Sequence, residues 1–332
     1  TLRREVAFKW VDPTVGERFR PVELLPFVTL KPEASLLVFA DDKPKSLEVT
    51  VTAHADEQSG EVLGQKYALK KKGDTAKLTL QVKPSTSTLA LGGQTLTRIE
   101  YPHIPVQTVL QPAEVKLVRV PLQRGRVTKV GYVPGAGDEV AQALRQVGYE
   151  VTVLDDEALR GKPLSGFDAI VVGIRAYNVN ARLPGYRARL MQYVEAGGTL
   201  LLQYNTKNRL SDVPPDLGPW PFELSNERVT EETAEMTWEK HASLSKPNAL
   251  AAADFDGWVQ ERGLYFAGKW DERYVTPLSM HDANEPARKG GLLIARHGKG
   301  TFIYTGLSFF RQLPAGVPGA YRLFANLLAH GR

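Results

Sequence analysis

The sequence predicts two domains in series: a β-sandwich over residues 1–123, followed by a doubly wound parallel α/β sheet over residues 127–332. In the first part, short apolar runs alternate residue by residue with polar positions, which is the period of half-buried strands. After Arg124-Gly125-Arg126 the pattern changes to strands followed by helices, which is typical of a parallel sheet covered on both faces. The length of 332 residues also fits two domains of roughly 150 residues each.

The first domain is predicted from paired strand patterns with turns between them. One pair turns at Asp41 to Pro44 and the next at Gly73-Asp74. After the second turn, apolar positions alternate with polar ones at Leu78, Leu80 and Val82. Several such strands at short spacing are typical of a sandwich. The strand patterns cover residues 34–55, 65–84, 95–110 and 113–122.

The second domain is predicted from strands and helices in alternation. Its first strand ends in a glycine-containing turn, and the next helix has apolar residues at helical spacing, namely Val140, Ala143, Leu144 and Val147. A helix over 182–196 places on its buried side Leu183, Leu190, Tyr193 and Val194. Further expected elements are strands over 127–135, 149–155, 167–174 and 199–204, a hairpin turning at Gly298-Lys299-Gly300, a closing helix over 319–330, and an irregular insertion over 206–289.

Composition and charge exclude several classes of protein. The formal charge is +5, and basic residues are scattered among acidic ones, without the basic and aromatic stripe of nucleic-acid binders. No apolar run approaches the roughly 20 residues that span a bilayer. We therefore expect neither a nucleic-acid partner nor a membrane span. The basic run Lys70-Lys71-Lys72 precedes Gly73-Asp74, which favours a solvated hairpin turn over a phosphate-binding patch.

Cysteine is absent, which removes disulfides, thiolate nucleophiles and zinc sites with sulfur ligands. The histidines lack ligand spacing, and for His281, Asp282 and Glu285 a surface turn is favoured over a metal site. We therefore expect no metal and no cofactor. The chain begins at Thr1 without a methionine or a charged, apolar leader, so we interpret it as a mature product or part of something longer. This is compatible with export from the cell.

Two groups of polar residues follow strands of the predicted parallel sheet. Ligands of open α/β sheets lie outside the carboxyl ends of the strands, so we expect the two groups to converge. For the group after the strand over 167–174, a loop pinned by the same side chains is the competing interpretation. The residues placed there as candidate ligand contacts are Arg175, Tyr177, Asn178, Gln203, Tyr204 and Asn205.

A third candidate group lies in the predicted insertion. Its carboxylates could serve acid–base chemistry, and its tryptophan could stack on a sugar in a cleft shared with Tyr177 and Tyr204. Alternation offers a scaffold explanation instead, in which Val259 and Leu264 face inward while the glutamine and arginine point outward. The residues of this group are Asp254, Asp256, Trp258, Gln260, Glu261 and Arg262.

The remaining motifs predict no catalytic residue. The glycines at 131, 135 and 137 match neither the dinucleotide-binding pattern nor the P-loop, and we expect them to shape a tight turn. Ser308 follows a strand but lacks the flanking glycine of a nucleophile elbow.

The sequence contains, in order, IEYPHIPVQTVL, FDAIVVGIRAYN, GGTLLLQYNT, ADFDGWVQERGLYF and GKGTFIYTGLSFFRQLPAGVPGAYRLFANLL. From about residue 98 onward, these segments resemble the C-terminal part of large bacterial PIG-L (LmbE-like) deacetylases. In that family a zinc-dependent N-acetyl-sugar deacetylase domain comes first. A β-sandwich and a domain similar to class I glutamine amidotransferases and the ThuA family follow it. The resemblance implies an Ig-like sandwich over 1–123 and a flavodoxin-like, amidotransferase-like fold over 127–332.

The resemblance carries over neither family active site. The His-Pro-Asp-Asp run that begins the deacetylase zinc site is absent, and the stretch Tyr-Pro-His-Ile-Pro has no carboxylates. The amidotransferase nucleophile is a cysteine after the strand equivalent to 199–204, where this chain has Tyr204 and Asn205. A phenol with a pKa near 10 and an amide are poor acyl acceptors. The resemblance therefore implies a vacated site that still offers hydrogen bonds and a ring for binding.

These observations leave three functions open. The first is a non-catalytic accessory region that holds an N-acetylated glycan or packs against the catalytic deacetylase domain of the same parent protein. The second is an independent hydrolase that uses Asp254, Asp256 or Glu261. The third is a purely structural interaction module. The sequence leaves open whether the chain has an activity of its own.

Overall fold

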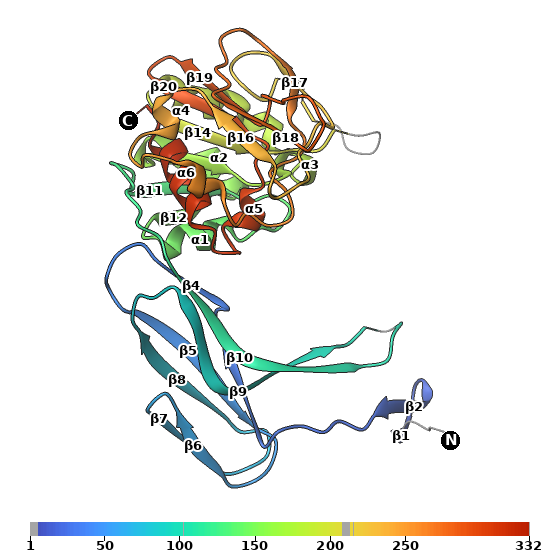
Figure 1. Cartoon of the computed structure of the whole chain (residues 1–332). Helices are drawn as coiled ribbons and strands as arrows, with labels where there is room; N and C mark the ends of the chain where they lie inside the picture. The colour runs from blue at the N-terminus through green and yellow to red at the C-terminus, as the bar shows by residue number, and fades with distance from the viewer. Residues whose placement is uncertain (1–5, 102, 208–212, 215, 332) are drawn as a thin grey trace. The chain divides into compact units, whose positions relative to one another are not determined.

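The computed structural model describes residues 6–101, 103–207, 213–214 and 216–331 (Figure 1). The chain divides into two compact units, unit 1 with Thr1–Leu37 and Asp42–Val118, and unit 2 with Val38–Asp41 and Arg119–Arg332. The predicted seam at Arg124-Gly125-Arg126 lies just inside unit 2. Strands outnumber helices, and one sheet is built mainly from parallel strands. The prediction of a mixed α and β architecture is confirmed at this level.

The first ten strands form the all-β part of the chain. They pair into two three-stranded sheets with the orders β3-β5-β8 and β4-β10-β9, and into the hairpins β1-β2 and β6-β7. Their bounds are β1 (Ala7–Asp12), β2 (Gly16–Pro21), β3 (Val28–Pro32), β4 (Leu36–Phe39), β5 (Lys45–Ala53), β6 (Gln58–Val62), β7 (Gln65–Leu69), β8 (Thr75–Val82), β9 (Ser87–Ile99) and β10 (Gln107–Arg119).

Strands β5 and β8 show the predicted alternation and contribute to the core of unit 1. They pair antiparallel, so that Leu47 lies opposite Leu80 and Val49 opposite Leu78. These side chains are buried, while the residues between them in β8 are exposed. Burial of each such side chain contributes about 1.5–3 kcal/mol relative to exposure. The prediction of a half-buried strand through Leu78 and Leu80 is confirmed.

Unit 2 is organised around a six-stranded sheet with the order β12-β11-β13-β14-β20-β19. All neighbours from β12 to β20 are parallel, and only β19 runs antiparallel. Both β13 and β14 are buried along their whole length, as strands covered on both faces are. The predicted hairpin of the last two strands is confirmed. The bounds are β11 (Lys129–Val133), β12 (Glu150–Val153), β13 (Ala169–Val172), β14 (Thr199–Gln203), β19 (Leu292–His297) and β20 (Gly300–Thr305).

The helices of unit 2 follow the strands as predicted, with one difference. The expected helix over 182–196 is a 3₁₀ turn, η2 (Leu183–Tyr186), followed by the α-helix α4 (Arg187–Glu195). Pro184 and Gly185 are poor α-helix formers, which delays the helix start. The other helices are α1 (Val140–Gln146), α2 (Asp156–Gly161), α3 (Ala176–Val179), α5 (Phe309–Gln312), α6 (Pro318–Ala329), and the 3₁₀ turns η1 (Leu164–Gly166), η3 (Ala242–Leu244) and η4 (Ala252–Phe255).

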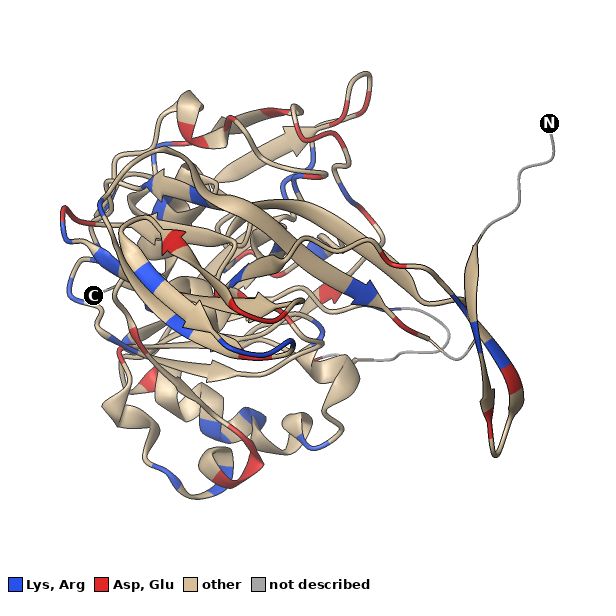
Figure 2. Cartoon of the chain, turned by 90° about the horizontal axis from the view of Figure 1, so that it is seen from below, with Lys and Arg blue, Asp and Glu red and all other residues tan. Residues whose placement is uncertain are grey.

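The predicted irregular insertion holds two small antiparallel sheets. One pairs β15 (Phe222–Leu224) with β17 (Ala267–Trp270), and the other pairs β16 (Glu235–Trp238) with β18 (Leu278–His281). Strands this short show no period, so the sequence pattern misses them. None of the helices in the described ranges combines the length and apolar character needed to cross a membrane. Figure 2 shows Lys and Arg intermingled with Asp and Glu along the ribbon.

Candidate functional site

The loops after β11 and β13 pack directly against each other. The strand order reverses at β11, with β12 on one side and β13 on the other, and open α/β sheets bind ligands at such a reversal. Here the Ala136 N–H donates to the carbonyl oxygen of Ile174 at 2.8 Å. A Cβ added to Gly135 would lie 2.0 Å from the same oxygen. Glycine is therefore required at this position, and backbone contact takes up the space that a ligand would need.

Three polar side chains meet at the same strand ends. The Tyr132 hydroxyl donates to Asp138, whose carboxylate also accepts the Val140 N–H at 3.0 Å and the Ile174 N–H at 3.3 Å. Burial, reinforced by the Asp138 charge, raises the pKa of Tyr132. Gln203 is fully buried and close enough to Tyr132 to lower that pKa, yet neither of its amide atoms meets hydrogen-bond geometry with any described residue. Unsatisfied buried amides are rare, so Gln203 marks a polar position that the fold itself leaves unused.

The predicted groups after β13 and β14 are brought together by paired asparagines. Asn205 is fully buried, accepts the Tyr177 N–H at 3.0 Å and donates to the Gln203 carbonyl at 3.1 Å. Asn178 exchanges hydrogen bonds with the backbone of Thr206 at 2.8 and 2.9 Å. These amides are therefore consumed in joining α3 to the loop after β14, in agreement with the interpretation of a pinned loop.

The tyrosines of these groups are buried rather than exposed to a ligand. Tyr177 is 7% exposed and Tyr204 is 6% exposed, and burial raises the pKa of each phenol to about 12. The Tyr204 ring stacks on Tyr265 with centroids 5.5 Å apart. Arg175, in contrast, is exposed, has a positive φ of 54° and donates its N–H to the Tyr204 carbonyl at 2.8 Å.

The segment Asp254 to Arg262 buries its tryptophan and its arginine, and the expected alternation is wrong at Val259 and Arg262. Arg262 was expected to point outward but is only 5% exposed, because its guanidinium supplies donors to the carbonyls of Ala234 and Phe255. Val259 was expected to face inward but is 36% exposed. The segment is not a strand, and Gln260 within it has a positive φ of 65°, which breaks a period of two.

The expected sugar cleft does not form in this structure. Trp258 is 3% exposed, packs beside Phe255 and Phe309 and donates from Nε1 to the Asp254 carbonyl at 3.3 Å. A ring buried in this way offers no free face to a sugar, and the same holds for Tyr177 and Tyr204. The prediction of a sugar-binding cleft lined by these three rings is therefore wrong.

The carboxylates of the segment have structural partners. Asp254 lies 3.1 Å from Arg322 and also accepts the Ala251 N–H at 2.9 Å. Glu261 lies 2.7 Å from Arg311. Asp256 and Gln260 are exposed. Within the described ranges, no cluster of histidine, aspartate and glutamate side chains is suited to hold a metal ion.

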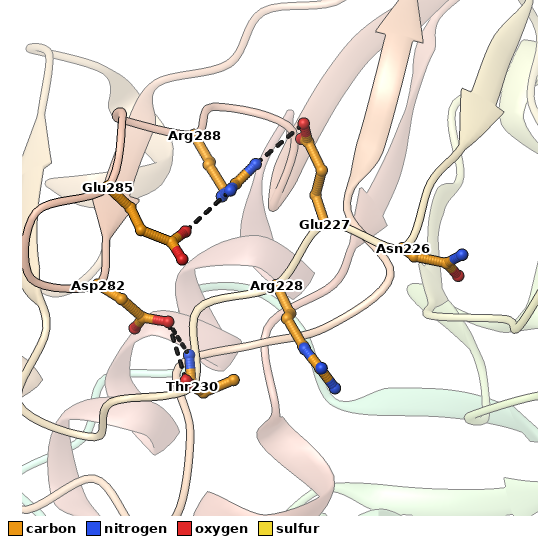
Figure 3. A pocket seen from close by; sticks show the side chains of 7 residues that line it. All are labelled: Asn226, Glu227, Arg228, Thr230, Asp282, Glu285 and Arg288. Atoms are coloured by element: carbon orange, nitrogen blue, oxygen red, sulfur yellow. Dashed lines mark hydrogen bonds and ion pairs between the residues drawn. The ribbon is translucent and has the colours of Figure 1, made fainter.

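Two neighbouring pockets share Asn226 and Arg228 among their lining residues. The smaller, of about 230 Å³, is lined by Asn226, Arg228, Leu264 and Tyr265. The larger, of about 450 Å³, is shown in Figure 3 and is lined by Asn226, Glu227, Arg228, Thr230, Asp282, Glu285 and Arg288. Because Tyr265 stacks on Tyr204, the smaller pocket lies next to the carboxyl end of β14.

The acidic side chains of the larger pocket each have a hydrogen-bond or ion-pair partner. Burial alone would raise the pKa of Asp282, but N–H donors of Thr230 and Glu231 outweigh it and lower that pKa. Arg288 bridges Glu285 at 2.8 Å and Glu227 at 3.0 Å. These contacts, drawn in Figure 3, leave no free general base among the pocket carboxylates.

The side chains of Asn226 and Arg228 remain available. Both are exposed, and neither has a hydrogen bond or ion pair to a side chain in the described part of the molecule. Figure 3 shows them extending away from the ion pairs of Arg288. The sequence pattern missed them and Tyr265. The signal that marks Tyr265 is a positive φ of 54°, and such strained backbone clusters at functional sites.

Comparison with known proteins identifies no family for this chain and only distant structural neighbours. Neither a protein-family model nor a curated protein matches the sequence. Among solved structures, a cold-adapted β-galactosidase from Rahnella sp. R3 is 16% identical with a TM-score of 0.37, covering 58% of this chain and 30% of that one. A β-galactosidase from Bacillus circulans sp. alkalophilus is 14% identical with a TM-score of 0.37, covering 60% and 30%. The match thus spans less than a third of either enzyme, and likeness at this level carries no functional argument.

Proposed function

We propose that this chain is a non-catalytic accessory region that binds an N-acetylated glycan, within a PIG-L/LmbE-type N-acetyl-sugar deacetylase. The sequence segments described above support the family context. The observation that supports binding is that two exposed polar side chains near Tyr265 have no partner among the described side chains, while the neighbouring carboxylates are paired. Asn226 and Arg228 are exposed and unengaged by other described side chains, whereas Glu227, Glu285 and Asp282 are each held by a partner.

The topology of unit 2 supports a flavodoxin-like, class I glutamine amidotransferase-like fold. Its parallel strands follow the order 2-1-3-4-5 when numbered along the chain, which is the flavodoxin-like order. In the amidotransferases the nucleophile follows the strand equivalent to β14. Here the Tyr204 ring stacks on Tyr265, and the Asn205 side chain holds α3 through the Tyr177 N–H. These contacts support a position that has a structural role and no catalytic one. For unit 1 we propose an Ig-like sandwich.

The amide, guanidinium and phenol groups that line the smaller pocket are chemically suited to bind a sugar. Sugar hydroxyls need both donors and acceptors, which an amide supplies together, and a guanidinium adds further donors. A phenol ring beside them offers an apolar surface for a sugar face or an N-acetyl methyl group. The hydrolase alternative finds less support, because Asp254 and Glu261 are engaged by Arg322 and Arg311.

Titration calorimetry with chito-oligosaccharides tests the proposal. Because the smaller pocket places Arg228 and Tyr265 together, we expect Arg228→Ala and Tyr265→Ala each to weaken binding about tenfold, equal to about 1.4 kcal/mol. Arg160→Ala is the matched control, since Arg160 is exposed on α2 and should leave affinity unchanged. Cello-oligosaccharides, which lack the N-acetyl group, should bind more weakly.

Absence of binding heat at millimolar chito-oligosaccharide would remove the glycan proposal. Equal loss of affinity in Arg160→Ala would show that any binding is non-specific and electrostatic. Trp258 fluorescence is a poor substitute as the readout, because Trp258 is buried and does not line the smaller pocket.

A further inference from the structure

The hairpin of β1 and β2 carries large aromatic side chains on its surface. Phe8 and Trp10 are two residues apart on β1, so they share a face of the ribbon, and their rings stack with centroids 6.1 Å apart. They are 52% and 38% exposed. An isolated two-stranded hairpin is marginally stable in water, so exposed rings on it point to contact with something else.

Two neighbouring pockets of unit 1 connect these rings to basic side chains. The larger, of about 560 Å³, joins Phe8 and Arg20 of the hairpin to Lys72 and Arg98. The smaller, of about 200 Å³, is lined by Trp10 and again by Arg20 and Arg98. Because the pockets share these arginines, they form one groove that extends from Phe8 to Trp10. We call it the hairpin groove.

One cation of the hairpin groove is already neutralised. Arg98 donates to both oxygens of Glu23, at 3.2 and 2.9 Å, and Thr108 donates its hydroxyl to the same carboxylate. These contacts, from Arg98 first, lower the pKa of Glu23, so it is ionised at neutral pH. Arg98 and Glu23 therefore cancel in charge.

Two other cations of the groove remain unpaired in the described structure. The Arg20 guanidinium lies 5.2 Å from the Phe8 ring centroid and acts on Glu23 through its charge, without a hydrogen bond or ion pair to it. The ammonium group of Lys72 has no hydrogen bond or ion pair among the described residues. His54 also lines the groove, but burial first, then Arg98 and Lys72, lower its pKa. It is therefore neutral at pH 7, and the groove presents positive charge from Arg20 and Lys72.

We propose that the hairpin groove binds an acidic oligosaccharide that bears uronate carboxylates. Sugar rings have apolar faces that stack on Phe8 and Trp10, and their carboxylates pair with Arg20 and Lys72. This site lies in unit 1 and takes an acidic sugar, so it goes beyond the N-acetylated glycan proposed for unit 2. It also gives a binding role to one lysine of the basic run, which the sequence favoured as a solvated turn.

The charge of the hairpin groove favours an acidic sugar over a nucleic acid. Nucleic-acid affinity comes mainly from several phosphate contacts, whereas only Arg20 and Lys72 are free here. The carboxylate of Glu100 lines the smaller pocket beside Arg20 and further limits the positive charge available to a polyphosphate. A short uronate chain can pair with Arg20 and Lys72 while its rings contact Phe8 and Trp10, so it needs no larger positive surface.

Titration calorimetry with tetragalacturonate at low salt tests this inference, with cellotetraose as the neutral probe. We expect tetragalacturonate to bind and cellotetraose to bind at least about tenfold more weakly, because the neutral sugar forms no ion pairs. Trp10→Ala, Arg20→Gln and Lys72→Gln should each weaken tetragalacturonate about fivefold or more. Lys71→Gln is the matched control from the same basic run; Lys71 is exposed and lines neither pocket, so this variant should bind as the native chain does.

Several results would overturn the inference. They are equal affinity for the two tetrasaccharides, loss in Lys71→Gln equal to that in Lys72→Gln, or an oligothymidylate that binds more tightly than tetragalacturonate. Circular dichroism checks that the variants remain folded, which is expected of exposed positions. Tyr265→Ala should leave tetragalacturonate binding unchanged, so this site and the one in unit 2 succeed or fail separately.

Discussion

Replacing Arg262 with alanine removes a cation from the interior of unit 2. Its Nη2 and Nε donate to the Ala234 carbonyl at 2.9 and 3.2 Å, and its Nη1 donates to the Phe255 carbonyl. The guanidinium also lies 5.6 Å from the Trp258 ring centroid. A single side chain thus joins the loop before β16, the turn η4 and the tryptophan that follows it.

We expect Arg262→Ala to lower the free energy of unfolding by about 3–5 kcal/mol. A buried acceptor left without its donor costs roughly 1–3 kcal/mol, so the two carbonyls together cost about 2–6 kcal/mol. The lost cation–π contact adds about 1 kcal/mol. Burial lowers the pKa of Arg262, which shows that the charge is desolvated, and relief of this penalty offsets part of the loss.

Urea denaturation followed by tryptophan fluorescence and far-ultraviolet circular dichroism measures this change. Arg228→Ala is the matched control, because Arg228 is exposed and its removal should alter stability by no more than about 0.5 kcal/mol. Arg262→Lys should recover part of the loss, since an ammonium can still donate to one of the carbonyls. A loss below about 1 kcal/mol in Arg262→Ala would refute the reasoning, because it would mean that neither carbonyl depends on the guanidinium.

Three further outcomes are expected. Asn326→Ala should lower the free energy of unfolding in urea by about 2–4 kcal/mol, because the buried amide of Asn326 accepts from and donates to Asn248; a loss no larger than that of an exposed substitution would contradict this. Burial, then His241 and Arg296, lower the pKa of His330 from 6.5 to about 4. The unfolded chain therefore binds the extra proton, so stability should fall as the pH drops from 6.5 to about 4, and His330→Gln should flatten that slope in urea titrations. The purified chain should release no glutamate from glutamine above a blank, since the proposed amidotransferase-like fold would have Tyr204 and Asn205, and no thiol, after β14; steady turnover would sink the vacated-site interpretation.

The sequence predicted the parts of the fold that local pattern controls. Alternation through Leu78 and Leu80 predicted a strand of unit 1, and continuous apolar runs predicted β13 and β14. In each case the burial of a residue follows from the period of its own segment. The closing helix α6 and the hairpin of β19 and β20 are of the same kind.

The candidate site could not be predicted as well, because its residues depend on distant partners. Arg262 is buried by carbonyls of Ala234 and Phe255, and nothing in its own segment distinguishes it from an exposed arginine. Tyr265 lines the smaller pocket and has a positive φ that a tyrosine rarely adopts. Asn226 and Arg228 become candidates only because their neighbours Glu227 and Asp282 are occupied by others.

The place of β20 in the sheet has a consequence for synthesis of the chain. β20 lies beside β14 in the middle of unit 2, with Thr199 opposite Thr301, so a central strand leaves the ribosome long after the neighbour with which it pairs. Until then β14, apolar along most of its length, has an open edge of unpaired amides. A nascent chain stalled near residue 290 would hold β11 to β14 with that edge exposed, and we expect a holdase chaperone to bind it while ignoring a chain in which β20 is paired with β14.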